Sequence, residues 1–477
     1  MTPFAERCGQ HDAARVAACE ALLKRVRDER MDSVRLVWCD LHGSLRGKTL
    51  MPGALADALQ QGVSLVATLM LKDSADRTVL PVFDPGGAPA GFAGAANLVL
   101  LPDPARFTPL PWAAGSAWLP AQPWFGDARP VPQDSRRVLQ QALAALAGAG
   151  YGLRCGLELE FHVYRIADER LDPATAAWPG EPPAVTMIHP GYRLLSDTWA
   201  DLADPVLGLL RRTAQGLGLP LRSLEIEFGP SQFEAVFDPL DALAAADAVV
   251  AFRNGASQAL RRAGYHASFI CLPPFPNVMA SGWHLHQSLQ RLDDGGNAFV
   301  DAHETLSPAG RHYLAGLLSH ARAATAFATP TVNGYDRFRP HALAPTSVRW
   351  GRDNRGAMLR VLGGAGDPAT RIENRTGEPA ANPYLYIASQ IHAGLDGLRR
   401  GLAPPPPTDD PYAEGGETLP ASLTEALDAL ADDALLADAM GRDAVDLFVR
   451  TKRHEQARFE AADEAGAWHA REYFGRP

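Results

Sequence analysis

The sequence predicts an α+β fold whose larger part contains a mostly antiparallel sheet. Three observations support this prediction. Residues 150–400 mix strand-like and helix-like runs without the regular alternation of strand and helix that a parallel sheet requires. Several of these runs alternate apolar and polar residues, as strands with one buried face do. The chain of 477 residues also exceeds one ordinary domain, so two domains are expected.

The first expected element is a helix over residues 13–30, where apolar side chains recur at close to helical spacing. Strand-like runs follow, for example at 34–39 and 98–101, and turns rich in glycine and proline lie between them. These elements predict a small α+β unit that ends near the proline-rich stretch 109–131.

The larger unit begins after this stretch, and we predict two domains over residues 1–118 and 119–477. A second amphipathic helix is expected over 133–149, directly before the run that carries the first pair of acidic residues. Residues 404–407 are four consecutive prolines and predict a stiff loop. Charged and apolar residues interleave over 421–475, which predicts helices at the end of the chain.

Composition and charge exclude several classes of function. A net charge of −10 argues against general nucleic-acid binding. The five cysteines are odd in number and form no C-x-x-C pair, so neither a disulfide framework nor a structural zinc site is expected, and a reducing cytoplasm fits. No signal pattern opens the chain, and no apolar run approaches the roughly 20 residues that span a bilayer. The expected protein is cytoplasmic, with no nucleic-acid or membrane partner.

Pairs of polar residues spaced two apart are the strongest functional signal. Glu158 and Glu160 alternate with Leu157, Leu159 and Phe161, so both carboxylates point to one face of a strand. Like charges on one face repel each other unless a cation lies between them. The spacing recurs in three further pairs: Glu225 with Glu227, His284 with His286, and Glu373 with Arg375. Several such strands predict an interior that holds metal ions and an anionic substrate.

Arginines cluster between residues 337 and 375, where no lysine occurs. Arginine suits bidentate binding of carboxylate and phosphate groups. A solvated arginine-rich surface is the alternative interpretation. Against it, Arg360 lies within the apolar run 358–362, and Arg371 and Arg375 flank Glu373 with a period of two, as expected for buried strands. The cluster comprises Arg337, Arg339, Arg349, Arg352, Arg355, Arg360, Arg371 and Arg375.

Seven short segments, taken in their order and spacing, give the chain a specific family resemblance. It resembles the glutamine synthetase family, class I type, over nearly its whole length. Any one of the segments is weak alone, whereas chance is not a serious explanation for the whole set. The segments are residues 156–161, 227–234, 281–289, 332–335, 350–355, 369–375 and 382–385.

The resemblance implies an N-terminal β-grasp-like domain and a C-terminal catalytic domain with a curved antiparallel sheet. It also implies a homo-oligomer, typically a dodecamer of two stacked hexameric rings, with active sites between neighbouring subunits. Two or more Mg²⁺ or Mn²⁺ ions per site would suit the oxygen-rich ligands. Carried over by position, the ligands of one ion would be Glu160, Glu227 and Glu234, and those of the second Glu158, His284 and Glu373.

The same resemblance implies that ATP and L-glutamate meet at these ions. The residues facing the ATP phosphates would be His286, Ser288, Arg355, Arg360 and Arg371. Arg337 and Arg375 would hold glutamate, and Arg355 would lie near the phosphate being transferred. A carboxylate is a poor acyl donor, and its phosphorylation by ATP converts it to an acyl phosphate that an amine can attack.

The sequence departs from true glutamine synthetases where ammonium would bind. In the family, a flap glutamate and an aspartate in an Asp-Gly-Ser-Ser loop hold that ion. The flap here is residues 340–345, with Leu343 in the position of the glutamate, and the loop is replaced by residues 64–70, which contain no carboxylate. An apolar wall favours an amine that carries its own apolar body. The chain therefore resembles the branch that ligates γ-glutamyl groups to amines or polyamines.

Two further departures leave alternatives open. The family commonly shows Asn-Gly or Ala-Gly directly before a Ser-Gly-x-His segment, where this chain has Met279 and Ala280. Met279 cannot bind the amino group of glutamate as asparagine can, so a related acid stays possible as the donor in place of glutamate. His341 on the flap is a candidate base toward the amine, with a solvated loop histidine as the alternative. A true glutamine synthetase with an altered ammonium site is the second functional hypothesis. A catalytically inactive structural homologue is the third, although all six implied metal ligands are present.

Overall fold

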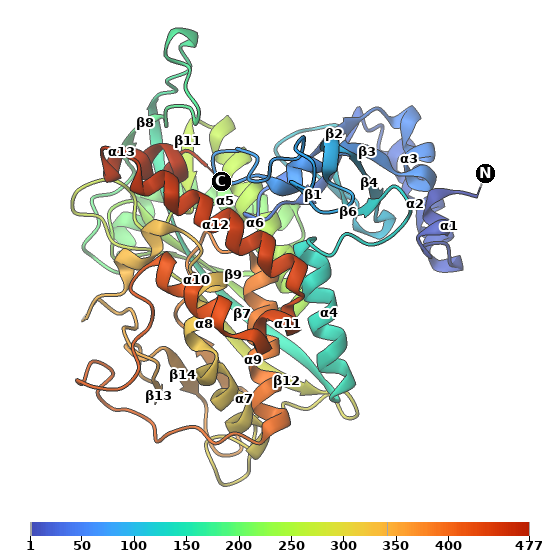
Figure 1. Ribbon diagram of the computed structural model, residues 1–477. Coiled ribbons are helices and arrows are strands. Elements are labelled where there is room, and N and C mark those ends of the chain that lie inside the picture. The colour runs from blue at the N-terminus through green and yellow to red at the C-terminus, as the bar shows by residue number, and fades with distance from the viewer. Residues whose placement is uncertain (1, 341, 477) are drawn as a thin grey trace.

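The computed structural model describes residues 2–340 and 342–476. A smaller N-terminal part, blue in Figure 1, lies beside a larger part that contains most of the chain. Each part has its own sheet. The mixture of helices and mainly antiparallel strands confirms the predicted α+β class.

The first sheet has the strand order β2-β1-β6-β4-β3, and β5 pairs with β6 at its side. Side chains of helices α2 (Ala13–Asp28) and α3 (Leu55–Gln61) join those of the strands in one apolar core. β6 continues past the predicted boundary at residue 118 and keeps residues 119–125 within this sheet. The strand bounds are β1 Ser33–Cys39, β2 Leu45–Leu50, β3 Val63–Val66, β4 Asn97–Pro102, β5 Thr108–Pro109 and β6 Ser116–Phe125.

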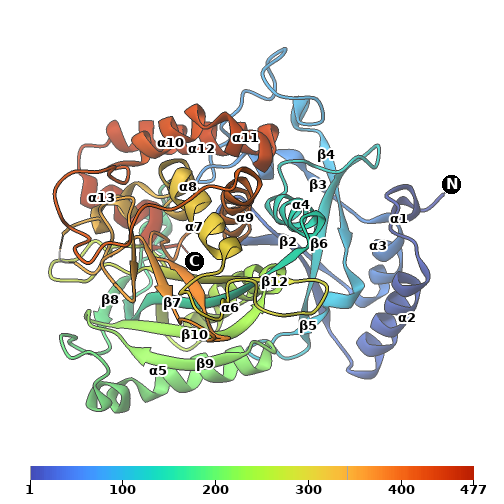
Figure 2. The ribbon, with the colours of Figure 1, turned by 90° about the horizontal axis from the view of Figure 1, so that it is seen from below.

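The second sheet has nine strands in the order β13-β14-β15-β12-β7-β10-β9, with β8 and β11 paired to β7. All pairs are antiparallel except β13 with β14. The sheet curls, and Figure 2 shows β7, β10 and β9 bending together. The strand bounds are β7 Tyr151–Asp168, β8 Ala184–Met187, β9 Leu221–Ile226, β10 Gln232–Asp241, β11 Tyr265–Ser268, β12 Trp283–Arg291, β13 Trp350–Arg352, β14 Leu359–Leu362 and β15 Arg371–Asn374.

Strand β7 shows why the sheet has two different faces. Leu153, Cys155, Leu157, Leu159 and Phe161 are buried on one face, where they join the main core. Burying each large apolar side chain contributes about 1.5–3 kcal/mol to folding. The intervening positions, which include both glutamates, lie on the opposite face. The hydrophobic alternation thus directs the carboxylates away from the core.

Helices cover the apolar face and continue to the end of the chain. The predicted helix at 133–149 is α4, and the predicted helical region at 421–475 consists of α10 to α13 and a last turn at 470–474. None of the helices among the described residues is both long and apolar enough to cross a membrane. The helix bounds are α1 Phe4–Arg7, α4 Ser135–Gly148, α5 Asp197–Gly216, α6 Ala242–Arg262, α7 Pro308–Ser319, α8 Ala321–Ala328, α9 Pro383–Arg400, α10 Leu423–Asp432, α11 Ala434–Met440, α12 Arg442–Glu460 and α13 Ala465–His469.

Buried polar contacts fasten the N-terminal part to the C-terminal helices. Asp73, from the loop after β3, accepts hydrogen bonds from Nδ1 of His454 at 2.8 Å and Nε of Arg458 at 2.9 Å. Its neighbour Ser74 donates its backbone N–H to Glu455 at 3.1 Å. Asp73 and Glu455 are fully buried, so these contacts satisfy charges that would otherwise be costly. The two parts are therefore joined by specific bonds as well as by the peptide chain.

Candidate active site

The polar face of the second sheet brings the carboxylates together through strand register. Glu160 on β7 pairs with Glu234 on β10, and Glu158 pairs with His284 on β12. On the other side of β12, His286 pairs with Glu373 on β15. Directly paired residues have their side chains on the same face. The alternation seen in the sequence therefore gathers five of the six implied metal ligands, together with His286, from four adjacent strands.

The first group of potential metal ligands is formed by Glu158, Glu234 and His284. One ligand atom of each lies within 4.8 Å of the others. Nδ1 of His284 is 3.3 Å from Oε2 of Glu158 and 3.9 Å from Oε1 of Glu234. Nε2 of the same ring is 3.8 Å from Oε1 of Glu160. His284 thus lies at the centre of three carboxylates.

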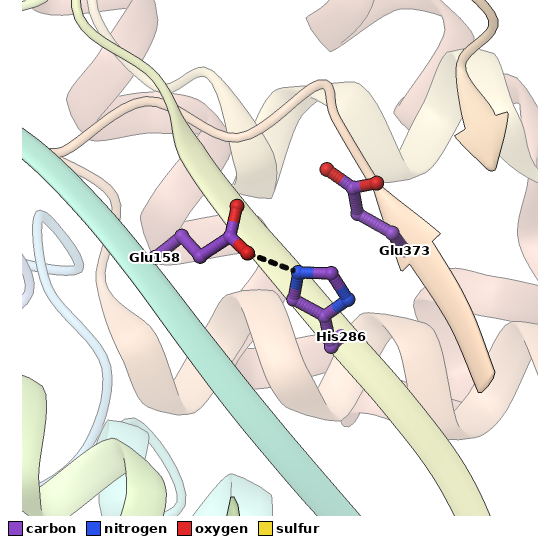
Figure 3. Close-up of side chains that lie close together, drawn as sticks. All are labelled: Glu158, His286 and Glu373. Atoms are coloured by element: carbon purple, nitrogen blue, oxygen red, sulfur yellow. Dashed lines mark hydrogen bonds and ion pairs between the residues drawn. The ribbon is translucent and has the colours of Figure 1, made fainter. Parts of the chain in front are cut away.

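The second group is formed by Glu158, His286 and Glu373, again within 4.8 Å (Figure 3). Nε2 of His286 is 2.9 Å from Oε1 of Glu158. Glu158 therefore belongs to both groups. The family resemblance implies that His286 faces the ATP phosphates, whereas its ring also lies where it can bind a metal ion. No pattern in the sequence distinguishes these two roles, because His284 and His286 lie on the same strand face.

Clustering makes three of the carboxyl groups difficult to ionise. Burial, with the nearby charge of Glu227 adding to it, raises the pKa of Glu160 to about 7. Burial also raises the pKa of Glu234 to about 10, and the charges of Glu160 and Glu158 act in the same direction. Burial raises the pKa of Glu227 as well. Glu160 and Glu227 are the implied ligands that lie outside the two groups. Glu227 follows β9, and its charge acts on Glu160.

Opposite charges stabilise the ionised form of the other two carboxyl groups. For Glu158, burial is outweighed by hydrogen bonds from His284 and His286, which lower its pKa. For Glu373, burial is outweighed chiefly by the charge of Arg375, and its pKa is lowered. Glu373 is fully buried. It accepts a hydrogen bond from Nη1 of Arg360 at 3.0 Å and forms an ion pair with Nη1 of Arg375. Two arginines thus support one carboxylate.

The chemistry of this donor set fits divalent cations. Carboxylates that repel each other in a buried place become compatible when a cation lies between them. Nδ1 of His284 is buried between Oε2 of Glu158 at 3.3 Å and Oε1 of Glu234 at 3.9 Å, so a cation bound to its lone pair would be shared with two carboxylates. Carboxylate oxygens with a minority of imidazole nitrogens suit Mg²⁺ or Mn²⁺ better than softer metals. The residues present therefore fit the metal ions that the sequence analysis expected.

A large cavity opens beside these groups. Its volume is about 750 Å³, within the range of small-molecule sites. Three of the expected phosphate-binding residues line it: His286, Ser288 and Arg371. Nε of Arg371 donates to Nδ1 of His286 at 3.2 Å, which fixes the ring. Arg154 also lines the cavity. It was not among the predicted site residues, although the period-two spacing that includes Glu158 and Glu160 also includes position 154 on the same strand.

The other arginines predicted to bind substrates differ in burial and in their partners. Arg360 is buried and lies between Glu373 and Asp353, so here it supports a carboxylate and does not line the cavity. Arg337 is buried and donates to the carbonyl oxygen of Gly377 at 3.1 Å. Arg355 is exposed. His341 lies outside the described residues.

Leu343 lies beside the arginine that supports Glu373. Nη2 of Arg375 donates to the carbonyl oxygen of Leu343 at 3.3 Å. The leucine has φ = +53°, an unfavourable backbone conformation for such a residue, and its side chain is 64% exposed. The next residue, Ala344, is held by the hydroxyl of Tyr412, which donates to its carbonyl oxygen at 3.2 Å. The flap position thus contributes an exposed apolar side chain.

Comparison with known proteins identifies a family and several relatives that this chain resembles over most of its length. Residues 132–473 match the model of the glutamine synthetase catalytic domain. A γ-glutamylanilide synthase from Acinetobacter sp. is 39% identical over 96% of this chain and 95% of its own. A γ-glutamylethanolamide synthetase from Streptomyces coelicolor is 30% identical over 98% and 99% of the two chains. A solved complex of GmaS with ADP superposes with a TM-score of 0.77 at 29% identity, over 94% and 98% of the two chains.

Proposed function

Since this chain belongs to the glutamine synthetase family and is a carbon–nitrogen ligase, we propose that it joins the γ-carboxylate of L-glutamate to an organic amine. The reaction would proceed through γ-glutamyl phosphate at the expense of ATP, releasing ADP and phosphate. Two relatives that align with nearly the whole chain are named for γ-glutamyl amides of aniline and ethanolamine, which supports an amine as acceptor.

The observation that carries the proposal is the combination of a complete carboxylate cluster with an apolar flap. Glu158, Glu234 and Glu373 lie where they can bind cations, as the family's reaction requires. Leu343 offers no negative charge to attract ammonium, and its backbone contacts Arg375 at the edge of the cluster. The cluster therefore supports activation of a carboxylate, and Leu343 in place of the family's flap carboxylate supports an acceptor other than ammonium.

The residues divide the chemical work between them. Glu158, Glu160, Glu227, Glu234, His284 and Glu373 would hold the divalent ions. When bound, these ions would neutralise the charge of the ATP phosphates during transfer. Ser288, Arg371 and His286 would position the nucleotide in the cavity. Arg337 and Arg375, both buried, would orient the carboxylates of glutamate, and Arg355 would face the transferring phosphate.

We also propose that the active protein is a ring of identical subunits, a dodecamer of two stacked hexamers. Leu343 and other apolar side chains beside the site are exposed in the single chain, and a neighbouring subunit would shield the acyl phosphate from water. Light scattering on the purified protein would then give a mass of twelve chains of 51.1 kDa each. A monomer with full activity would contradict this arrangement.

An acceptor panel tests the proposed reaction. The purified protein would be supplied with ATP, Mg²⁺ and L-glutamate, and phosphate release would be measured with ammonium, methylamine, isopropylamine, ethanolamine, aniline, putrescine or spermine. Mass spectrometry would identify the amide formed. We expect turnover with at least one organic amine to exceed that with ammonium. If ammonium were the best acceptor, the protein would instead be a glutamine synthetase. Phosphate release that requires no acceptor would contradict the assignment as a ligase.

A further inference from the structure

A second cavity lies at the boundary between the N-terminal part and the larger part of the chain (Figure 1). Its volume is about 210 Å³. Strands β1 and β6 line it on one side, and helices α4, α6 and α9 line it on the other. It shares no lining residue with the cavity beside the carboxylate cluster. The reaction proposed above therefore gives this second cavity no role.

Apolar side chains form the walls of the second cavity. Val37 and Trp118, from the N-terminal sheet, belong to a small apolar cluster that is separate from the two larger cores. Leu217 and Ala251 pack against this cluster from the larger part. The ring of Trp118 meets that of Trp112 edge to face, with centroids 5.2 Å apart. Such walls favour a ligand with an apolar, planar body, because aromatic rings pack well against apolar and aromatic side chains.

The size of the second cavity suits a molecule with a single ring. One water molecule has a share of about 30 Å³ in the liquid, so the volume of about 210 Å³ corresponds to about seven waters. Close-packed protein contains few voids larger than one water molecule. Sites for drug-sized ligands begin at about 300 Å³. The cavity is therefore larger than a packing defect and fits a ligand smaller than a drug.

One end of the second cavity is polar and carries a network of ion pairs. Asp247 accepts hydrogen bonds from Nε and Nη2 of Arg136, both at 3.0 Å, and from the hydroxyl of Tyr384 at 2.6 Å. Nη2 of Arg106 is 2.9 Å from the same carboxylate. Nη1 of Arg136 makes no hydrogen bond within the part of the chain that the structure describes. Arg136 can therefore offer a donor to a ligand.

Asp134 is the other acidic residue at this end. It directly precedes α4, is only 2% exposed, and its side chain does not cap the helix. Its Oδ2 is buried and has no hydrogen-bond partner among the described residues. Burial raises the pKa of Asp134 to about 6, although the charges of Arg137 and Arg136 and nearby backbone N–H groups act in the opposite direction. A buried carboxylate oxygen without a partner is costly, and a donor supplied by a ligand would compensate for it.

The charges at the polar end decide which kind of ligand fits. Arg106 and Arg136 contribute two positive charges. Asp134 and Asp247 contribute two negative charges, so the lining side chains are close to neutral in sum. A charged ligand would lose its hydration here without finding a counter-charge that is free. A neutral hydroxyl group avoids this cost, because it can donate to a carboxylate and accept from a guanidinium at the same time.

We propose that the second cavity binds a small neutral aromatic molecule of the phenol class. The ring would pack against Trp118, the hydroxyl would donate to Asp134, and the hydroxyl oxygen would accept from Arg136. A ligand in this position contacts both parts of the chain, so its binding stabilises the boundary between them. The site is independent of the proposed ligation reaction.

Ligand-observed saturation-transfer NMR on the full-length protein tests the site, with phenol as the probe. We expect phenol to bind the parent protein with a dissociation constant of about 1 mM or lower. Benzoate, benzylammonium and toluene replace the hydroxyl by an anion, a cation and a methyl group, and each should bind at least about tenfold more weakly. Equal or tighter binding of any of the three would overturn the assignment to a neutral hydroxyl. A protein that binds no phenol at about 10 mM would overturn the site altogether.

Substitutions locate the binding and avoid every residue placed in the active site. Ala251→Leu fills part of the cavity, and Asp134→Ala removes the acceptor. Each should weaken phenol binding at least about tenfold. Ala244→Leu makes the same change at an exposed position of α6 and should leave phenol binding within about threefold of the parent.

Melting temperatures without ligand would check that each variant is folded. Ala251→Leu leaves the ion-pair network intact, so it tests the site even if Asp134→Ala does not fold. Phenol binding that is unchanged in Ala251→Leu would overturn the assignment to this cavity. Binding that is lost in Ala251→Leu and unchanged in a folded Asp134→Ala would overturn the proposed hydrogen bond.

Discussion

At the scale of single residues, Glu158 connects the two potential metal groups. It lies 3.3 Å from His284 in one group and 2.9 Å from His286 in the other. Hydrogen bonds from both rings keep this carboxyl ionised, whereas burial and neighbouring charge raise the pKa of Glu234 to about 10. Neighbouring carboxylates on one sheet face therefore have opposite shifts, and a bound cation would favour the ionised form of both.

Removal of one carboxylate should weaken cation binding measurably. In the parent protein, excess Mn²⁺ should raise the melting temperature, because a ligand present at about 100 times its dissociation constant stabilises the fold by about 2.7 kcal/mol. We expect Glu234→Gln to lose about half of this shift or more, since tenfold weaker binding removes about 1.4 kcal/mol. Differential scanning fluorimetry with and without a chelator would measure the shift. Glu304→Gln, an exposed glutamate, is the matched control, and equal shifts in both variants would argue against a metal role for Glu234.

The side chain at position 343 should control the use of ammonium. Leu343→Glu places a negative charge beside Arg375 and the cluster, where it can attract a small cation. We expect kcat/KM for ammonium to rise roughly tenfold, equivalent to about 1.4 kcal/mol. Leu343→Gln has a similar shape without the charge and should show no such rise. Identical ammonium kinetics in the two variants would show that the charge at position 343 does not determine which acceptor is used.

The sequence predicted the residues of the site better than their grouping. Glu158, His284 and Glu373 could be anticipated because period-two spacing determines the face of a strand on which a side chain lies, whereas Glu234 was expected only from the family resemblance. The approach of His286 to Glu373 could not, because it depends on β12 pairing with β15 across 87 residues of chain. The contact of Arg360 with Asp353 could not be anticipated either, because it depends on a local turn that leaves no periodic pattern in the sequence.

At the scale of elements, the buried His320 links the junction of α7 and α8 to α9 and to the start of α11. It lies between α7 and α8, and its Nε2 is 3.0 Å from Oδ2 of Asp396 on α9. Its Nδ1 is 2.5 Å from Oδ2 of Asp433, which directly precedes α11. Burial alone would lower the pKa of His320, but hydrogen bonds with the two aspartates outweigh burial and raise this pKa above 6.5. The protonated ring therefore stabilises the packing of these helices.

This linkage predicts a direction for the pH dependence of stability. A folded-state pKa raised above the unfolded value contributes stability that is fully present below the unfolded pKa of 6.5 and is lost as pH rises through the folded pKa. The destabilisation caused by His320→Gln should accordingly be largest near pH 6, about 1.5–3 kcal/mol, and should shrink toward pH 9. Urea unfolding across this range would measure it. His303→Gln, at an exposed histidine, should show no such trend, and a constant difference for His320→Gln would exclude a protonated ring.

Elements with strong periodicity were predictable from the sequence, and irregular ones were not. The helices now seen as α2 and α4 and the long strand β7 follow directly from hydrophobic spacing. The strained loop around Tyr192 gave no signal, because a positive φ at a tyrosine contradicts local preference and is imposed by tertiary contacts with Phe228 and Asn277. The pairing of β13 in parallel with β14 likewise depends on the fold of the whole sheet.

At the scale of the whole molecule, one arginine joins the two parts of the chain. Arg458 on α12 donates to Asp73 at 2.9 Å and from Nη1 to Glu472 at 2.9 Å. Asp73 belongs to the N-terminal part, and its carboxylate is fully buried. Removing the arginine would leave two buried carboxylates with less compensation. This contact therefore helps to fix the relative position of the two parts, together with the bonds from His454 to Asp73 and from Ser74 to Glu455.

Replacement of Arg458 should destabilise the molecule more than replacement of a neighbour on the same helix. We expect Arg458→Gln to lower the free energy of unfolding by about 3 kcal/mol, as for a broken buried ion pair. Arg453→Gln removes an exposed arginine that pairs with Asp428 on the surface, and it should cost less than about 1 kcal/mol. Denaturant unfolding of both variants would make the comparison. Equal stabilities would contradict an anchoring role for the contact.

The proposed function of the whole molecule requires that its carboxylate and arginine cluster activates the side-chain carboxylate of glutamate by phosphoryl transfer. The most direct measurement uses L-glutamate labelled with ¹⁸O in both γ-carboxylate oxygens, together with ATP, Mg²⁺ and the best organic amine. An acyl phosphate intermediate predicts that each phosphate released with the amide carries one ¹⁸O atom. Amide formation accompanied by unlabelled phosphate would contradict the account, because the carboxylate oxygen would then never have been bonded to phosphorus.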